Sequence, residues 1–223
     1  MSAQTTITAV AYLALSAHLE AAYPHEGAGL LLGKADRIDR AITSVLTLPN
    51  RWDDAEQYHR FLLTPQDMLA GEHEAARRGL DVIGIFHSHP DHPAEPSGFD
   101  RDWALPWYVY TISRVSDGRL DHPRLAAPRR SHRLHRRHVL HHWPTSKDTM
   151  TTIRIPTPLR QYTAGQAEIA VAGTNVSTAL DDLAGQYPGL RGHLYTEQGQ
   201  LRGFVNIFLN DEDVRHLQGA ATP

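Results

Sequence analysis

A short apolar stretch that runs directly into two histidines constrains the fold of this chain more than any other part of its sequence. Residues 82–86 read Val-Ile-Gly-Ile-Phe, and their apolar, β-branched character predicts a buried strand. Successive side chains of a strand point to opposite faces, so His87 and His89 are expected to share one face. The sequence therefore predicts a sheet in which one strand ends with two imidazoles close together.

The start of a helix follows this strand, within residues 96–105. Ser97 fits the N-cap position and Asp100 comes three residues later. At a helix N-terminus the dipole keeps Asp100 ionised and able to bind a metal ion. Two imidazoles and one carboxylate leave a fourth tetrahedral position for water, which is typical of a catalytic rather than a structural zinc site.

Each motif also has a simpler interpretation when it is taken alone. Ser97 and Asp100 have the spacing of an ordinary helix-capping pair. A single histidine at the end of a strand is more often hydrogen-bonded within the fold than bound to a metal. The occurrence of both motifs together, at this distance, favours the metal site.

Short strands and helices alternate along the first part of the chain, up to about residue 118. The hydrophobic patterns predict helices at residues 11–23 and 65–78. They predict strands at residues 6–10, 28–32, 42–48, 82–87 and 108–113. This alternation is typical of an α/β layer architecture.

The composition changes after residue 118. Between residues 119 and 143 arginine, histidine and proline dominate and apolar periodicity is lost. A basic patch for nucleic acid is conceivable, but without interleaved aromatic residues a solvated linker is the favoured interpretation. From Met150 onward the pattern is globular again, with alternating Ile153 and Ile155, helical spacing near residues 176–183, and a later strand at residues 205–209.

The two motifs around the histidines resemble a known signature. Residues 87–90 read His-Ser-His-Pro, and Ser-x-x-Asp follows at residues 97–100. Together they are similar to the signature of the JAMM (MPN-plus) zinc metalloprotease family. The resemblance implies a JAMM/MPN-type, cytidine-deaminase-like mixed sheet flanked by helices over residues 1–118. It also implies that His87, His89 and Asp100 bind Zn²⁺, although spacing alone would also accept iron or cobalt.

The family also requires an upstream glutamate, and residues 23–33 resemble the segment that carries it, with Glu26 in the matching position. The resemblance implies that Glu26 is the general acid/base and that Ser97 stabilises the oxyanion. Small and apolar neighbours should desolvate Glu26 and raise its pKa toward neutrality. Without the resemblance, the favoured interpretation of Glu26 is a surface charge that follows a helix ended by Pro24. Ser97 would then be interpreted as a helix cap.

The C-terminal part resembles a different family. Residues 151–160 and 204–215 look like ubiquitin-fold sulfur carriers of the ThiS/MoaD type, especially the carrier of actinobacterial cysteine biosynthesis. The resemblance implies a small β-grasp (ubiquitin-like) domain over residues 150–223, joined to the first domain by the linker 119–149. The domain is expected to lack the family's last strand and Gly-Gly tail, because the sequence ends Gly-Ala-Ala-Thr-Pro. A missing strand should leave an unpaired sheet edge.

The two resemblances together imply a function. We expect a zinc-dependent metallopeptidase that hydrolyses an amide or isopeptide bond at the C-terminus of a ubiquitin-like sulfur carrier, releasing cysteine from a carrier–cysteine adduct. The alternative is a non-catalytic scaffold that binds such carriers and keeps a vestigial metal site. A general base is useful to the enzyme and has no role in the scaffold, so Glu26 favours the first hypothesis.

Composition narrows these possibilities further. The chain has no cysteine, which excludes a thiol nucleophile and disulfides. A net charge of −3 offers no electrostatic argument for a nucleic-acid partner. No apolar run approaches the ~20 residues of a membrane span, and no Lys or Arg precedes Lys34 to form the basic start of a secretory signal. A cytoplasmic location is expected, and the sequence leaves the oligomeric state open.

Overall fold

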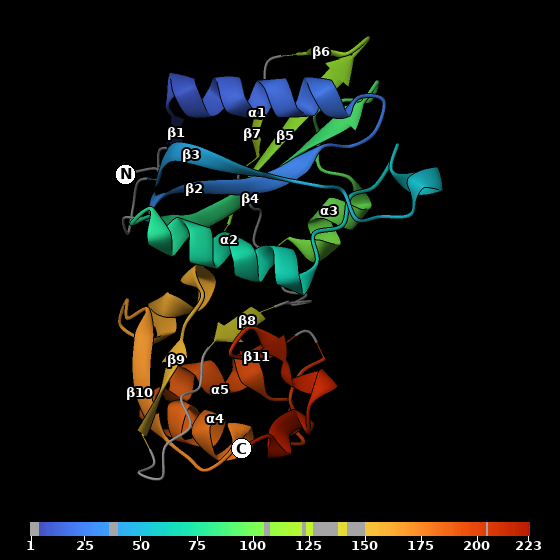
Figure 1. Cartoon of the computed structure of the whole chain (residues 1–223). Helices are drawn as coiled ribbons and strands as arrows, with labels where there is room; N and C mark the ends of the chain where they lie inside the picture. The colour runs from blue at the N-terminus through green and yellow to red at the C-terminus, as the bar shows by residue number, and fades with distance from the viewer. Residues whose placement is uncertain are drawn as a thin grey trace. The chain divides into compact units, whose positions relative to one another are not determined.

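The computed structural model describes residues 5–35, 40–104, 108–121, 124–126, 138–141, 150–203 and 205–223. The chain divides into two compact units, Met1–His135 and Arg136–Pro223. Within the described residues, unit 1 contains a seven-stranded sheet and unit 2 a five-stranded sheet (Figure 1). Among the helices that these ranges contain, none is both long and apolar enough to cross a bilayer.

The sheet of unit 1 has the order β1-β3-β2-β4-β5-β6, with β7 paired to β5. Its central strand β2 is antiparallel to both neighbours, whereas β1 with β3 and β4 with β5 form parallel pairs. The strands are β1 (Thr5–Ile7), β2 (Ala28–Ala35), β3 (Arg40–Leu48), β4 (Asp81–Pro90), β5 (Val109–Ser116), β6 (Arg119–Leu120) and β7 (Arg124–Ala126).

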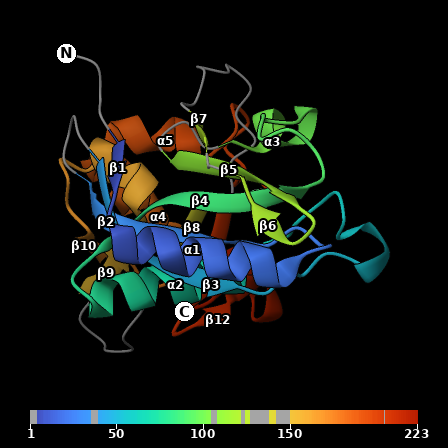
Figure 2. The same ribbon diagram turned by 90° about the horizontal axis from the view of Figure 1, so that it is seen from above.

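Helices cover both faces of this sheet. Helix α1 (Ala9–Ala22) lies on one face and α2 (Pro65–Arg77) on the other, as Figures 1 and 2 show. Strand alternation divides the core accordingly, because Leu31 packs in the cluster with α1 and Leu30 in the cluster with α2. The predicted fold class, a mixed sheet flanked by helices, is confirmed.

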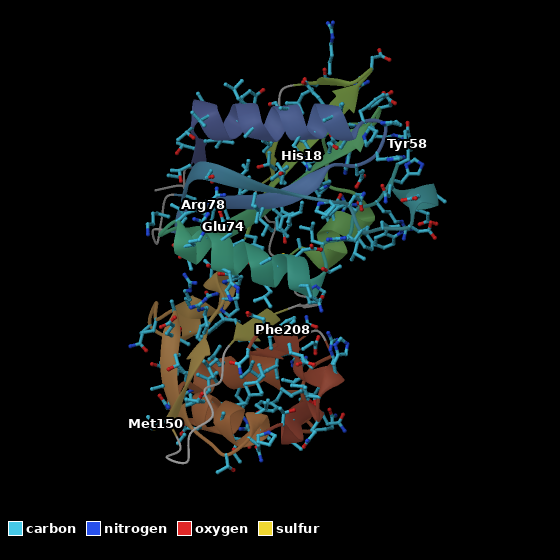
Figure 3. The ribbon with its side chains drawn as sticks, viewed as in Figure 1. His18, Tyr58, Glu74, Arg78, Met150 and Phe208 are labelled. Atoms are coloured by element: carbon cyan, nitrogen blue, oxygen red, sulfur yellow. The ribbon has the colours of Figure 1, made fainter. Side chains whose placement is uncertain are left out.

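A histidine of α1 joins this helix to the sheet. His18 points from α1 toward the strands (Figure 3), and its Nε2 lies 3.0 Å from the carbonyl oxygen of Ala28 in β2. Burial lowers the pKa of His18, which favours the neutral ring. This contact anchors β2 directly after the segment that carries Glu26.

Most element boundaries differ from the sequence prediction by one to three residues, and two of these differences are informative. The predicted strand 6–10 ends at Ile7, because the Thr8 side chain accepts a hydrogen bond from the amide of Ala11 and starts α1 there. The predicted strand 82–87 continues as β4 to Pro90. His89 as well as His87 therefore lies on the strand.

Unit 2 has the sheet order β10-β9-β8-β11-β12. Its elements are β8 (His138–His141), β9 (Met150–Arg154), β10 (Glu168–Ala172), α4 (Val176–Gln186), α5 (Pro188–Leu194), β11 (Val205–Leu209) and β12 (Glu212–Asp213). One apolar cluster fills this unit, and the predicted strand residues Ile153 and Ile155 and helix residues Leu180 and Leu183 all belong to it.

Strand β8 lies inside this sheet, between β9 and β11, antiparallel to the first and parallel to the second. We expected a missing strand to leave an unpaired edge in a domain starting at Met150. Strand β8, which precedes Met150, takes an interior place in the sheet, and the edges of the sheet are β10 and β12. Strands β6, β7 and β8 all fall within the range predicted as a linker, 119–149, whereas its basic stretch 129–137 lies outside the described residues. The boundaries at residues 118 and 149, predicted to separate the two domains from the linker, remain predictions.

Candidate metal centre

Three side chains converge where β4 ends and helix α3 (Gly98–Trp103) begins. The Nε2 atoms of His87 and His89 are 3.1 Å apart. Asp100 places Oδ1 3.3 Å from His87 Nε2 and Oδ2 3.5 Å from His89 Nε2. Among the described residues this is the one group of three or more potential ligands whose donor atoms all lie within 4.8 Å of one another.

The register of β4 explains why the two histidines meet. Its pairing with β2 shifts at Leu31 and Leu32, so that Phe86 packs in the α1 cluster whereas Ile85 packs in the α2 cluster. His87 and His89, two and four residues after Ile85, therefore share the α2 face. The prediction that they leave the strand on one face is confirmed.

Burial prepares His87 to act as a ligand. It is 1% exposed and stacks on the ring of Phe61 at 4.6 Å between centroids. Burial lowers the pKa of His87 and so favours the neutral imidazole, the form that binds metal ions. Its Nδ1 is buried and has no hydrogen-bond partner among the described residues.

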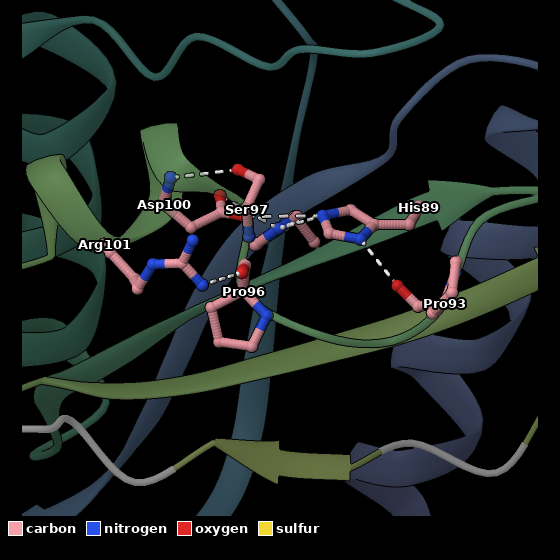
Figure 4. A network of polar contacts seen from close by, with 7 residues as sticks. His89, Pro93, Pro96, Ser97, Asp100 and Arg101 are labelled. Atoms are coloured by element: carbon pink, nitrogen blue, oxygen red, sulfur yellow. Dashed lines mark hydrogen bonds and ion pairs between the residues drawn. The ribbon is translucent and has the colours of Figure 1, made fainter.

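His89 is oriented by a backbone carbonyl. Its Nδ1 lies 2.9 Å from the oxygen of Pro93 (Figure 4). A proton on Nδ1 makes this hydrogen bond and leaves the lone pair of Nε2 directed at His87 and Asp100. Burial lowers the pKa of His89, but the hydrogen bonds with Asp100 and Pro93 outweigh it and raise the pKa above its usual value.

Asp100 is both a helix-capping residue and part of the converging group. Its Oδ2 accepts a hydrogen bond from the Ser97 amide at 2.7 Å, and its own amide donates to Ser97 Oγ at 3.1 Å (Figure 4). Burial opposes ionisation of Asp100, but hydrogen bonds from the two histidines and Ser97 hold its pKa below the usual range. The predicted capping pair is confirmed, and it does not compete with the ligand geometry because Oδ1 also faces His87.

Glu26 precedes β2 and is 5% exposed. Burial raises its pKa to about 8, with His89 opposing this rise and Asp100 adding to it. The carboxylate has no hydrogen-bond donor or ion-pair partner in the described part of the chain. The surface-charge interpretation of Glu26 is therefore excluded, and the expected rise of its pKa is confirmed.

Backbone hydrogen bonds fix the segment of Glu26 beside the histidines. Ser88 donates its amide to the Gly27 oxygen at 3.0 Å, and its Oγ accepts the Gly27 amide at 2.9 Å. Because Ser88 lies between the two histidines, the glutamate segment and the ligand strand are held in one register. The sequence contains this signal only as the middle residue of His-Ser-His.

Asn50 was not anticipated from the sequence. Its Nδ2 donates to the backbone oxygens of Glu26 at 3.0 Å and Arg60 at 2.8 Å. Its Oδ1 accepts the amides of Trp52 at 3.0 Å and Leu62 at 3.1 Å. One side-chain amide thus closes the loop 51–62 against the glutamate segment, whereas in the sequence an Asn at this place signals only a turn.

This loop forms one wall of a pocket of about 260 Å³. Glu26, His89, Ser97 and Asp100 line it, together with Arg60 and His92. Ser97 Oγ accepts a hydrogen bond from Asp100, and its hydroxyl proton has no acceptor among the described residues. The pocket therefore brings a buried carboxyl group, a free hydroxyl donor and two of the three converging side chains, His89 and Asp100, to one small volume.

Several known proteins are similar to parts of this chain. Residues 8–126 match the family described as prokaryotic homologs of the JAB domain. The probable TtuB-protein conjugate cleaving protease of Thermus thermophilus is 33% identical over 102 residues, which are 44% of this chain and 64% of that protein. The solution structure of protein DSY2949 from Desulfitobacterium hafniense has a TM-score of 0.47 at 32% identity, covering 54% of this chain and 80% of that one.

A second likeness concerns a shorter stretch. The sulfur carrier protein CysO of Mycobacterium tuberculosis is 41% identical over 73 residues, which are 32% of this chain and 78% of the carrier.

The match to the family of prokaryotic JAB-domain homologs spans more than half of the chain and includes Glu26, both histidines, Ser97 and Asp100. The chain belongs to the family of prokaryotic homologs of the JAB domain.

Proposed function

We propose that the chain is a zinc-dependent metallopeptidase that hydrolyses the amide or isopeptide bond at the C-terminus of a ubiquitin-like sulfur carrier and releases cysteine. The observation that carries this proposal is Glu26, a buried carboxyl group without a partner among the described residues, whose pKa is raised to about 8 in the pocket that His89 and Asp100 line. A structural role would call for a paired carboxylate, because an unpaired buried charge destabilises a fold.

The donor set fits a zinc ion. His87 and His89 direct their Nε2 atoms at each other and at Asp100, an arrangement that a shared cation stabilises. The carbonyl of Pro93 orients His89 through Nδ1, the ring nitrogen that does not face the other ligands, as partners of metal-bound histidines usually do. When bound, zinc would acidify water and polarise the substrate carbonyl.

The chain's own residues would carry the proton transfers. The Glu26 carboxylate accepts a proton from the attacking water and delivers it to the amide nitrogen that leaves. Its pKa near neutrality suits both steps, since the same group must take up and release the proton. The Ser97 hydroxyl donates a hydrogen bond to the oxyanion that develops on the former carbonyl oxygen.

The substrate class rests on two likenesses. A relative over part of the chain is a probable protease of TtuB conjugates, and another is the sulfur carrier CysO. We therefore expect a ubiquitin-like sulfur carrier, or its amino-acid adduct, as the partner. A pocket of about 260 Å³ is smaller than the usual site for a drug-sized ligand, and it suits a slim peptide tail.

Glu26→Gln tests this function. We expect the variant to retain zinc, because Glu26 is not one of the converging ligands, and to lose hydrolysis of a carrier–cysteine adduct by about 100-fold or more. His25→Gln, at the exposed neighbouring position, is the matched control and should keep both properties. Bound metal is measured by elemental analysis and hydrolysis by mass spectrometry.

Two outcomes contradict the proposal. Hydrolysis that persists at the wild-type rate in Glu26→Gln removes the assigned general base. Stoichiometric metal with no hydrolysis by the wild-type protein supports a carrier-binding scaffold instead.

A further inference from the structure

The pocket contains one permanent positive charge that the proposed hydrolysis does not use. Among the described residues that line the pocket, Arg60 is the one arginine or lysine. Two carboxyl groups, those of Glu26 and Asp100, line the same pocket without pairing with it. A guanidinium in a peptidase pocket points to an anionic group on the substrate.

Two aromatic rings hold the Arg60 guanidinium in place. Its Cζ lies 5.4 Å from the ring centroid of Trp52 and 5.6 Å from that of Phe99, and these two rings meet edge to face at 5.8 Å. Neither ring takes up an N–H of the guanidinium in a conventional hydrogen bond, and the Arg60 side chain is 46% exposed, so its N–H donors stay available. Because Phe99 directly precedes Asp100, the charge is held next to the ligand-bearing turn of α3.

The backbone of Arg60 is tied to that of Glu26. Asn50 Nδ2 donates to the carbonyl oxygens of both residues, at 2.8 Å and 3.0 Å. The general base and the arginine are thus positioned by the same side-chain amide. This connection fixes the backbone from which the arginine extends relative to the backbone of the general base, and the two rings hold the side chain.

The existing ion pair of Arg60 is weak enough to be exchanged. Its Nε lies 3.5 Å from Glu56 Oε2, and the two side chains are 46% and 58% exposed. Exposed pairs of this type contribute little free energy because water screens them. A substrate carboxylate that forms two parallel hydrogen bonds with the guanidinium is the stronger partner.

We propose that Arg60 binds the free α-carboxylate of a single amino acid joined through its α-amine to the carrier's C-terminus. This inference rests on the proposed function and narrows its substrate class. A Gly-Gly tail presents no anion on its own side of the scissile bond. An amino-acid leaving group carries its carboxylate one carbon from the scissile nitrogen, whereas a lysine side chain in an isopeptide bond has none nearby.

The test compares two adducts of one carrier, ending in Gly-Gly-Cys with a free carboxylate or with a carboxamide, using the zinc-loaded full chain. We expect kcat/KM to be about 10-fold or more higher for the free acid. In Arg60→Gln the acid-to-amide ratio should fall to near one, and in Arg60→Lys it should be partly restored, because lysine keeps the charge without the planar fork.

Arg51→Gln is the matched control. Arg51 lies on the same loop, is 54% exposed and faces Asp67 at 3.6 Å, so the variant should keep the wild-type preference for the acid. A wild-type ratio near one, or a ratio that survives in Arg60→Gln, overturns the carboxylate site while leaving the peptidase intact. If the wild-type protein cleaves neither adduct, the proposed function fails and the carboxylate site fails with it.

Discussion

Glu26 of unit 1 and Asp213 of unit 2 are both buried carboxyl groups, but their surroundings differ. Asp213 of unit 2 is 2% exposed and accepts hydrogen bonds from the amide and Nε of Arg215, both at 2.9 Å. These hydrogen bonds lower the pKa of Asp213. Glu26 of unit 1 is 5% exposed, has no such partner among the described residues, and its pKa rises to about 8.

Under the proposed function, the difference separates a structural charge from a reactive one. A buried acid that is paired and hydrogen-bonded serves the fold, because its charge is compensated. A buried acid left unpaired beside converging ligands is poised for proton transfer, and strongly shifted pKa values cluster at such sites. Among the described residues, the one cluster of three potential ligands lies in unit 1.

The largest expected effect comes from removing a ligand of unit 1. His87→Ala deletes a nearly unexposed imidazole, and we expect metal affinity and hydrolysis to fall by more than about 100-fold, since even partners of metal ligands are worth 10–100-fold. Elemental analysis and an assay with a carrier–cysteine adduct measure the two losses. His25→Ala changes an exposed histidine and should alter neither. Full metal content in His87→Ala would refute the ligand assignment.

The sequence predicts most of this site because its residues obey local rules. Alternation on a strand brings His87 and His89 to one face, and capping spacing brings Asp100 to a helix N-terminus. Asn50 escaped prediction because its four hydrogen bonds reach Glu26, Trp52, Arg60 and Leu62, and only the folded loop brings these groups together.

The same reasoning explains why strand β8 of unit 2 was not predicted from the sequence. Strand β8 pairs in parallel with β11, about 67 positions later in the chain, and no local pattern records such a partner. Its surrounding composition, rich in arginine and histidine, indicated a linker. The sequence does predict the helix at residues 176–186 and the strands at 150–154 and 205–209, because the apolar residues of each recur with the period of its own secondary structure.

A second effect should appear in the pH dependence of stability of the metal-free protein. The pKa of Glu26 rises from 4.5 to about 8 on folding, so its contribution is fully present below pH 4.5 and is lost as pH rises through 8. Glu26→Gln removes this dependence. At roughly 1.4 kcal/mol per pKa unit, the rise from 4.5 to about 8 should let the variant gain about 5 kcal/mol over wild type between pH 4.5 and pH 8.5.

Urea unfolding across this pH range, followed by a signal of unit 1, measures that gain. His89 and Asp100 face Glu26 and are present in both proteins, so the slope of the difference, rather than its absolute value, reports on Glu26. A difference that stays constant with pH would show that Glu26 is not desolvated, and the contrast with Asp213 would disappear.

The smallest effect is expected at the structural charge of unit 2. Asp213→Ala leaves the Arg215 amide without its acceptor and should lower the stability of unit 2 by about 1–2 kcal/mol. Asp213→Asn keeps an acceptor oxygen and loses the charge, so it should cost less than the alanine variant. Hydrogen exchange of amides in β11 and α4 follows unit 2 separately from unit 1. Zinc content and hydrolysis should remain at wild-type levels in both variants, because Asp213 is a stabilising charge; a loss of hydrolysis in folded Asp213→Asn would mean that the two units do not divide structure from chemistry.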